Sequence, residues 1–172
     1  MLDSFAGFII TCLLISISFF QMRFFFLFLN AVLIQFNGFA QTSKQADAVN
    51  GIWLTGSKEG KIEIFRGVDG RYHGKIIWLK EPVDEDGKPK LDKENPDLNR
   101  RKFPILGLQI MRGFRYDSEN VWVDGKIYDP ERGSDYRCKM TLVNENTLNV
   151  RGFVGMSLFG RTDTWNRIPE KK

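Results

Sequence analysis

Apolar and polar residues alternate in short segments through most of the chain beyond residue 50. Between residues 134 and 143, for example, Cys138, Met140 and Leu142 occupy one face, and the residues between them are polar. This alternation is typical of β-strands in a sheet that has one face in the core and one face exposed to solvent. The pattern predicts strands at residues 51–56, 60–67, 71–80, 106–117, 120–129, 134–143, 147–156 and 158–168.

Turn-forming residues separate these segments. Val68-Asp69-Gly70 supplies residues that tolerate a tight chain reversal. Gly152, Gly155 and Gly160 interrupt the last two strands, which weakens a flat sheet but suits the coiled strands of a closed barrel. We therefore predict one all-β domain over residues 51–168, a single antiparallel, mostly up-and-down barrel of about eight strands.

One long segment, residues 81–104, does not follow the alternation. Its 24 residues are rich in charged side chains and contain several prolines, so no strand is expected there. Loops of this length are usually functional or disordered. We expect this one either to fold across one barrel mouth as a mobile lid or to be a solvated surface excursion. A single helical turn capped by Asp92 or Asn95 is compatible with both.

The first forty residues are apolar, with Asp3 and Arg23 as their only charged residues. From Met22 onward they have the order of a secretory signal, because a basic start precedes an apolar core and small residues end it at Ala40. We predict cleavage after Ala40 and an exported protein, periplasmic or extracellular. The expected organisation is a signal region at 1–40, a flexible lead-in at 41–50, the barrel at 51–168 and a tail at 169–172.

Residues 1–21 allow two interpretations. In the first, Met22 is the true initiator and the residues before it are not part of the protein. In the second, the chain begins with a membrane segment of marginal length, since a span needs about 20 residues. The well-placed Met22-Arg23 favours the first interpretation, and no stable membrane span is then expected after processing.

Charge and cysteine content narrow the classes of function. Loss of the leader leaves the net charge of +4 unchanged, and basic residues alternate with acidic ones, which is a poor footprint for nucleic acid. Cys12 lies in the leader, so Cys138 is alone in the exported part and cannot form an internal disulfide. Its position in an apolar face predicts a small core residue and not a reactive nucleophile.

Few residues offer catalytic or metal-binding chemistry. His73 is the only histidine and has no Cys, His or carboxylate cluster around it in the sequence, so we expect a histidine on a strand face. Asp84-Glu85-Asp86-Gly87 is similar to the start of a calcium loop, but Lys88 occupies a ligand position. We therefore predict no metal, no cofactor and no enzymatic activity.

Aromatic and arginine side chains lie near both ends of the predicted barrel. If the first and last strands pair, Trp53 comes close to Trp165 and Arg167. A guanidinium over an indole face contributes roughly 0.5–2 kcal/mol and would plug one end of the barrel. We assign structural roles to Gly51, Asp129 and Arg167.

Arg161, Asp163 and Trp165 fall on one face of the last strand because strand side chains repeat every two residues. If this face points inward, Arg161 carries a charge that must be paired or offered to an anionic ligand. The alternatives are an ion pair of Arg161 with Asp129 or Asp163, an exterior ladder of ion pairs, and a ligand site. The candidate ligand-binding residues are Trp53, Tyr128, Arg151, Arg161 and Trp165.

Several blocks of the sequence together resemble a known family. They are Gly51-Ile52-Trp53; Asn95-Pro96-Asp97 with Arg100; Pro104-Ile105-Leu106-Gly107-Leu108; Gly125-Lys126-Ile127-Tyr128-Asp129-Pro130 with Gly133 and Tyr136; and residues 148–155 leading to Leu158, Gly160-Arg161-Thr162, Trp165 and Arg167. Over about residues 50–168 the chain resembles the uncharacterised family called domain of unknown function 2147. The resemblance implies a small exported protein with a lipocalin-like or calycin-like barrel, and it implies no activity.

The predicted function follows from the size of the barrel. About eight strands enclose either packed side chains or one small ligand. We predict a non-enzymatic protein that binds a small, partly apolar or amphipathic ligand in the barrel mouth. The alternative is an envelope interaction or structural protein with a filled barrel, which uses the 81–104 loop as its partner surface.

Overall fold

The computed structural model describes residues 44–155 and 160–169, and the compact unit that contains the sheet begins at Gln45. The expected signal region up to Ala40 lies outside the described residues. The elements are a short 3-10 helix η1 (Asp47–Val49) and the strands β1 (Gly51–Leu54), β2 (Gly60–Arg66), β3 (Tyr72–Leu79), β4 (Gln109–Ser118), β5 (Val121–Asp129), β6 (Ser134–Asn144), β7 (Thr147–Phe153) and β8 (Gly160–Ile168).

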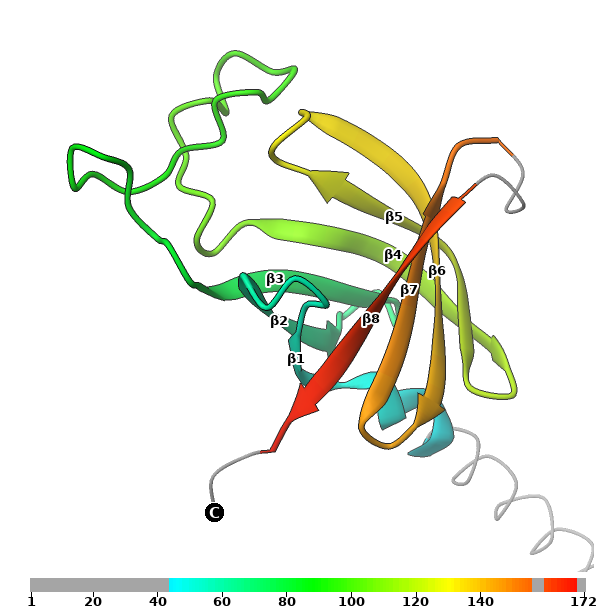
Figure 1. Ribbon diagram of the computed structural model, residues 1–172. Coiled ribbons are helices and arrows are strands. Elements are labelled where there is room, and N and C mark those ends of the chain that lie inside the picture. Colours follow the sequence, from blue (N-terminus) through cyan, green and yellow to red (C-terminus); the bar gives the residue numbers. More distant parts are fainter. Residues whose placement is uncertain (1–43, 156–159, 170–172) are drawn as a thin grey trace, which may run out of the picture. The chain divides into compact units, whose positions relative to one another are not determined.

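The strands form a closed antiparallel barrel in sequence order (Figure 1). Each strand pairs with the next, and β8 pairs with β1, so that Trp53 lies opposite Arg167. The predicted all-β barrel is confirmed. The strand predicted at 106–117 begins at Gln109, because Gly107 adopts a φ of 91° in the preceding turn. The strand predicted at 147–156 ends at Phe153, because Gly155 adopts a φ of 69°.

The inward faces of the strands build one apolar core. Its largest fully buried side chains include Trp53, Trp122 and Phe114, and they fill the space between the strands without a covalent crosslink. Cys138 is buried among them, as its apolar neighbours predicted. Burial raises the pKa of the Cys138 thiol to about 12, so the thiol stays protonated and inert at neutral pH.

One end of the barrel is closed by the segment that precedes β1. The indole Nε1 of Trp122 donates a hydrogen bond to the carbonyl oxygen of Ala46 at 3.1 Å. The hydroxyl of Tyr72 donates to Oδ1 of Asp47 at 2.7 Å. From Ala46 onward the expected lead-in is therefore packed against the barrel and is not a free segment. We call this end the capped end.

Arg167 completes the capped end. Its guanidinium carbon lies 4.1 Å from the ring centroid of Trp53. Its nitrogens donate to the carbonyl oxygens of Ala48, Asn50 and Glu145 at 2.5–2.6 Å. A Cβ on Gly51 would lie 2.6 Å from Nη1 of Arg167, and the φ of Gly51 is 131°. Glycine therefore leaves the room that the guanidinium occupies, which agrees with the structural roles predicted for Gly51 and Arg167.

The long loop between β3 and β4 lies at the opposite end and is tied to β5. The hydroxyl of Tyr128 donates to Oδ1 of Asp92 at 2.7 Å, and Asn95 Nδ2 donates to Oδ2 of Asp92 at 2.6 Å. Asp92 and Asn95 are buried. A Cβ on Gly133 would lie 1.8 Å from the carbonyl oxygen of Glu94, so the β5–β6 turn touches the loop backbone. These contacts hold the middle of the loop against the barrel.

The loop contains turns and two isolated β-bridges, Val83↔Pro89 and Leu91↔Pro104. The helical turn considered for this segment is not found, since residues 81–104 form turns. Asp92 accepts the hydrogen bonds of Tyr128 and Asn95, and Asn95 Oδ1 accepts the backbone N–H of Asp97 at 2.9 Å within a turn. The loop also exposes apolar side chains, with Leu98 at 71% and Phe103 at 50% exposure.

Candidate ligand site at the open mouth

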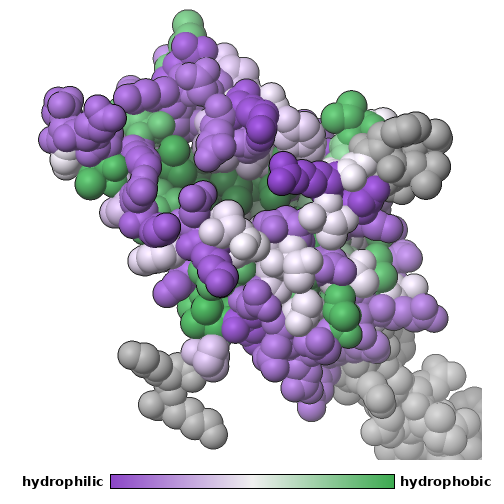
Figure 2. All heavy atoms as spheres, viewed as in Figure 1, coloured by the Kyte–Doolittle hydropathy of each residue, from purple (hydrophilic) through white to green (hydrophobic). Residues whose placement is uncertain are grey.

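The end opposite the cap is the open mouth. It is formed by the β1–β2 turn, the long loop, the β5–β6 turn, the end of β7 and the start of β8. Antiparallel succession of the strands places these parts at one end of the barrel. Figure 2 shows apolar surface in the recess beside the long loop, framed by hydrophilic residues.

A first cavity at this end has a volume of about 430 Å³. We call it the mouth cavity. Its apolar walls are Ile76 and Leu79 of β3, Ile105 of the long loop and Pro130 of the β5–β6 turn. Charged side chains surround these walls, namely Glu59, Lys80, Glu81, Lys90 and Glu131. An apolar chamber with a polar rim is typical of small-molecule sites, which usually have volumes of about 300–1,000 Å³.

A second cavity of about 530 Å³ lies on the other side of the same β5–β6 turn. We call it the arginine cavity. Its lining residues are Asp129, Arg132, Tyr136, Gly152, Phe153, Val154, Gly160 and Arg161. The two cavities adjoin one turn, since residues 130 and 131 line the first and residues 129 and 132 the second.

Arg161 is placed on the inner face of the barrel. It lies opposite Gly152, which itself lies opposite the buried Cys138, and cross-strand neighbours share a face. Within residues 44–155 and 160–169, the guanidinium of Arg161 has neither a hydrogen bond nor an ion pair. The inward phase that the sequence analysis considered for Arg161 is therefore found, and the side chain, which is exposed, lines the arginine cavity.

The two carboxylates that could have neutralised Arg161 are engaged elsewhere. Asp129 forms an ion pair with Arg132 at 2.7 Å and accepts the backbone N–H of Glu131. Asp163 accepts the indole N–H of Trp165 at 2.6 Å and the backbone N–H of Gly56 at 3.3 Å. In the part of the chain that the structure describes, the alternative of an internal salt bridge to Arg161 is not found.

Tyr128 lies on the outer face of the barrel. Its cross-strand neighbour Asp135 is exposed and forms an ion pair with Arg112, so this face points away from the core. The long loop covers the ring, and burial together with the hydrogen bond to Asp92 raises the pKa of Tyr128 to about 12. The prediction that Tyr128 contacts a ligand in the mouth is not supported, because its hydroxyl anchors the loop.

Arg151 also lies outside. It alternates with the buried Val150 and pairs with Thr162, to whose Oγ1 its Nη1 donates at 2.9 Å. The structure therefore separates Arg151 from Arg161, which the sequence analysis had grouped together. The outward position of Arg151 could have been predicted from the sequence, because Arg151 is one of the polar residues that alternate with apolar ones along its strand.

The two remaining candidates, Trp53 and Trp165, are buried in the core. The indole Nε1 of Trp53 donates to the carbonyl oxygen of Val49 at 2.9 Å at the capped end. Trp165 lies opposite Leu148 and bonds to Asp163. Both tryptophans form the filled body of the barrel below the mouth. Of the five predicted ligand residues, Arg161 is the one that lines either of the two cavities described above.

The predicted structural role of Asp129 has a clear local basis. Its Oδ1 accepts the backbone N–H groups of Glu131 and Arg132 at 3.0 and 3.3 Å. A carboxylate that accepts successive backbone donors fixes a tight turn. Asp129 thus shapes the β5–β6 turn that adjoins both cavities.

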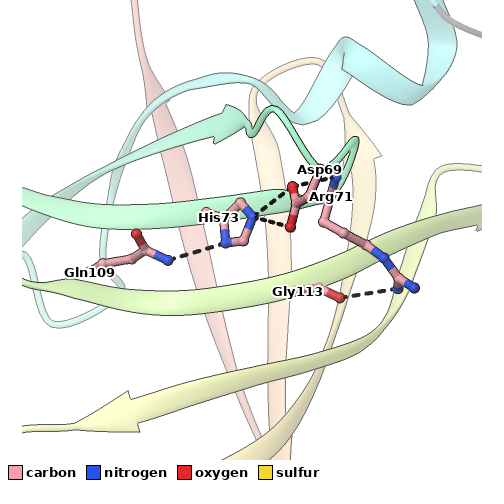
Figure 3. Close-up of polar contacts among 5 residues, drawn as sticks. All are labelled: Asp69, Arg71, His73, Gln109 and Gly113. Carbon is pink, nitrogen blue, oxygen red and sulfur yellow. Dashed lines mark hydrogen bonds and ion pairs between the residues drawn. The ribbon is translucent and has the colours of Figure 1, made fainter.

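His73 lies on the outer face of β3, as expected for a strand-face histidine. Its Nε2 is 3.2 Å from both carboxylate oxygens of Asp69, and Gln109 Nε2 donates to Nδ1 at 3.1 Å (Figure 3). Asp69 also accepts the backbone N–H of Arg71, and this bond together with His73 lowers the pKa of Asp69. The imidazole is held by the β2–β3 turn, on the outside of the sheet.

Most residues of the cavity walls were not predicted from the sequence. Leu79 faces the mouth because β2 and β3 shift register at Lys61/Ile62, which turns Trp78 outward beneath Lys61. Alternation counted from Tyr72 places Trp78 inside, and no residue type marks the bulge. For Tyr136 and Phe153, the aromatic side chain was the only feature of the sequence that could have suggested a place in a cavity wall.

The described residues contain no group of three or more His, Cys, Asp or Glu side chains arranged to hold a metal ion. Asp84, at the start of the calcium-like segment, accepts the backbone N–H groups of Asp86 and Lys88 in a turn. A search of the described helices found none with the length and apolar character of a membrane span.

Comparison with known proteins gives a family and a fold. The model of the family described as "Uncharacterized protein conserved in bacteria (DUF2147)" matches residues 51–167. A similar solved structure is described as "Protein HP1028 from the human pathogen Helicobacter pylori belongs to the lipocalin family". It superposes with a TM-score of 0.60 at 22% sequence identity, over 71% of this chain and 84% of that chain. No curated protein matches the chain. At this identity the likeness concerns the fold.

Proposed function

We propose a function from one premise: the chain belongs to the DUF2147 family of uncharacterized bacterial proteins. The proposed function is binding of a small, partly apolar ligand at the open mouth of the lipocalin-like barrel, without catalysis. It is supported by the mouth cavity, whose apolar walls remain accessible although the body of the barrel is filled. The single histidine supports binding over catalysis, since it is engaged on the outer face.

The proposal also concerns location. The signal-like order of residues 22–40 supports export to the periplasm or the cell exterior. The buried thiol of Cys138 is compatible with an oxidising compartment, because it is shielded from exchange. Sequencing the N-terminus of the protein used in the experiment below checks this part, and a chain that begins at Gln41 is expected.

Titration with Nile red, a neutral hydrophobic dye, tests the binding function. We expect saturable binding to protein purified from its own host and stripped of lipid. Leu79→Glu places a charge in the apolar wall of the mouth cavity, so it should weaken the dye by tenfold or more, since a buried unpaired charge costs several kcal/mol.

Val143→Glu is the matched control. Val143 is exposed near the capped end, so the same substitution there should leave dye affinity unchanged. Circular dichroism checks that both variants are folded. Absence of saturable dye binding to the wild-type protein would contradict the proposal and would favour the alternative, an interaction protein that uses the exposed Leu98 and Phe103 of the long loop.

A further inference from the structure

We infer that the ligand of the open mouth is an amphipathic monoanion whose carboxylate is bound by Arg161 in the arginine cavity. This inference rests on the proposed function and specifies the chemical class of the ligand. Four observations carry it: the position of Arg161, the net charge of the cavity wall, the further hydrogen-bond donors, and the apolar surface beside them.

The position of Arg161 makes its charge available. Its backbone lies opposite Gly152 on the inner face, and its side chain lines a cavity of about 530 Å³. Among the residues that the structure describes, no carboxylate or hydroxyl partner holds the guanidinium. The side chain of Arg161 is exposed, so a ligand can reach the guanidinium from solvent without displacing another residue.

The charged residues of the cavity wall favour a ligand that carries one negative charge. Its charged residues are Asp129, Arg132 and Arg161. Asp129 and Arg132 form an ion pair at 2.7 Å and compensate each other. One positive charge, that of Arg161, is left over. A carboxylate neutralises it in the bidentate geometry that guanidinium groups favour, whereas a phosphate dianion would bring an excess charge into the cavity.

Further donors and an apolar surface adjoin Arg161. Tyr136 offers a hydroxyl, and Arg132 has N–H groups beyond the one that bonds to Asp129. Phe153 and Val154 supply apolar surface at the edge of the same wall, where the Phe153 ring also lies 5.7 Å from the guanidinium carbon of Arg137 and Val154 is 70% exposed. Gly152 leaves the centre of the wall open: a Cβ there would only touch Ile127 and Tyr136, at 3.7 and 3.8 Å. The cavity therefore offers a cationic point and a hydrocarbon-lined space side by side.

Two ligands of equal chain length test the inference. Dodecanoate and dodecan-1-ol differ in the headgroup alone, and at pH 8 the carboxylate is ionised. Isothermal titration calorimetry with lipid-stripped protein should show dodecanoate binding at least tenfold more tightly than the alcohol. Arg161→Gln should weaken dodecanoate on the order of tenfold or more, the loss expected for one charge-assisted bond, and should leave the alcohol unchanged. Arg161→Lys should restore part of the lost affinity.

Arg151→Gln is the control, because Arg151 lies one residue from the same wall but on the outer face. It should alter neither affinity. Equal binding of acid and alcohol to the wild-type protein, or unchanged dodecanoate binding in Arg161→Gln, would overturn the inference while the proposed function stands. Tight binding of inorganic phosphate that depends on Arg161 would overturn the inference that the ligand is amphipathic. Failure of both dodecyl ligands and of Nile red to bind the wild-type protein would overturn the proposed function as well.

Discussion

The two ends of this barrel are built by the same eight strands of the described chain, yet they differ in how their polar groups are satisfied. At the capped end, Arg167, Trp122 and Tyr72 all bond to the segment that precedes β1. At the open mouth, Arg161 faces a cavity and apolar residues of β3 and the long loop line a recess. The capped end uses its aromatic and cationic residues for packing, and the mouth leaves similar residues accessible.

The pair Arg161 and Arg167 shows the difference within a single strand. Both arginines lie on β8 and share its inner face, six residues apart. Arg167 meets a tryptophan face and three carbonyl oxygens, whereas Arg161 meets glycine. The neighbouring residues, and not the residue type, decide whether an inward arginine stabilises the fold or is available to a ligand.

The largest expected effect is a loss of stability on truncation of the capped end. Trp53 is fully buried, and Trp53→Ala should lower the free energy of unfolding by about 3–5 kcal/mol, since it leaves a large cavity and removes the surface under Arg167. Urea unfolding followed by circular dichroism measures it. Trp78→Ala is the control, because Trp78 is 37% exposed on the outer face, and similar losses for both variants would contradict the comparison.

A smaller effect is expected from the two arginines of β8. Arg167→Lys keeps the charge but cannot reach all three carbonyl oxygens, so stability should fall by about 1–3 kcal/mol. Arg161→Lys should change stability by less than about 0.5 kcal/mol, because Arg161 lines a cavity. Urea unfolding of both variants provides the test. A larger loss for Arg161→Lys would show that the mouth, too, depends on its arginine for stability.

The smallest expected effect concerns pH and the loop anchor at the mouth. The pKa of Tyr128 is raised to about 12 by burial and by its bond to Asp92, whereas an exposed tyrosine has a pKa of about 10. The unfolded chain therefore loses this proton first, and the stabilisation is complete below about pH 10 and is lost as pH rises through 12. Tyr128→Phe should flatten this part of the stability profile, measured by urea unfolding between pH 9 and 12.

At pH 8 the same substitution should loosen the loop. Asp92 then loses one of its hydrogen-bond partners, and amide hydrogen exchange in residues 91–104 should become faster while the barrel strands stay protected. Tyr116→Phe on β4 is a suitable control. Unchanged exchange in the loop would show that the Gly133 contact with Glu94 is sufficient to hold it.

The fold and the cap could be predicted from the sequence because both depend on short-range patterns. Period-two alternation gave the strands, the glycines of the last strands indicated closure, and closure brought Trp53 and Arg167 together. The inward position of Arg161 followed from the same period. These inferences hold because a strand has only two faces and a closed barrel has a fixed neighbour for every strand.

The walls of the mouth could not be predicted, because they depend on irregularities. A bulge between β2 and β3 turns Leu79 inward, and the long loop returns to cover Tyr128 on the outside. Neither event follows from alternation, since a bulge shifts the phase and a loop contact joins residues 36 positions apart. Arg151 is a different case, because its place among the polar residues of β7 already indicated the outer face. The prediction of a ligand contact had not taken this into account.

Closure of the barrel through β1 also affects how the protein behaves when it opens. β1 has only four residues, and three residue pairs join it to the nine-residue β8. The β3–β4 junction, which the long loop connects, also has three residue pairs, and all other junctions have more. We therefore expect the seam between β1 and β8 to be one of the two places where the sheet separates first. A closed barrel presents no free edge, but separation of the seam would expose the backbone donors and acceptors of β8 to strands of other molecules. Arg167 lies at this seam beside Gly51, so we expect loss of its guanidinium to favour self-association as well as unfolding.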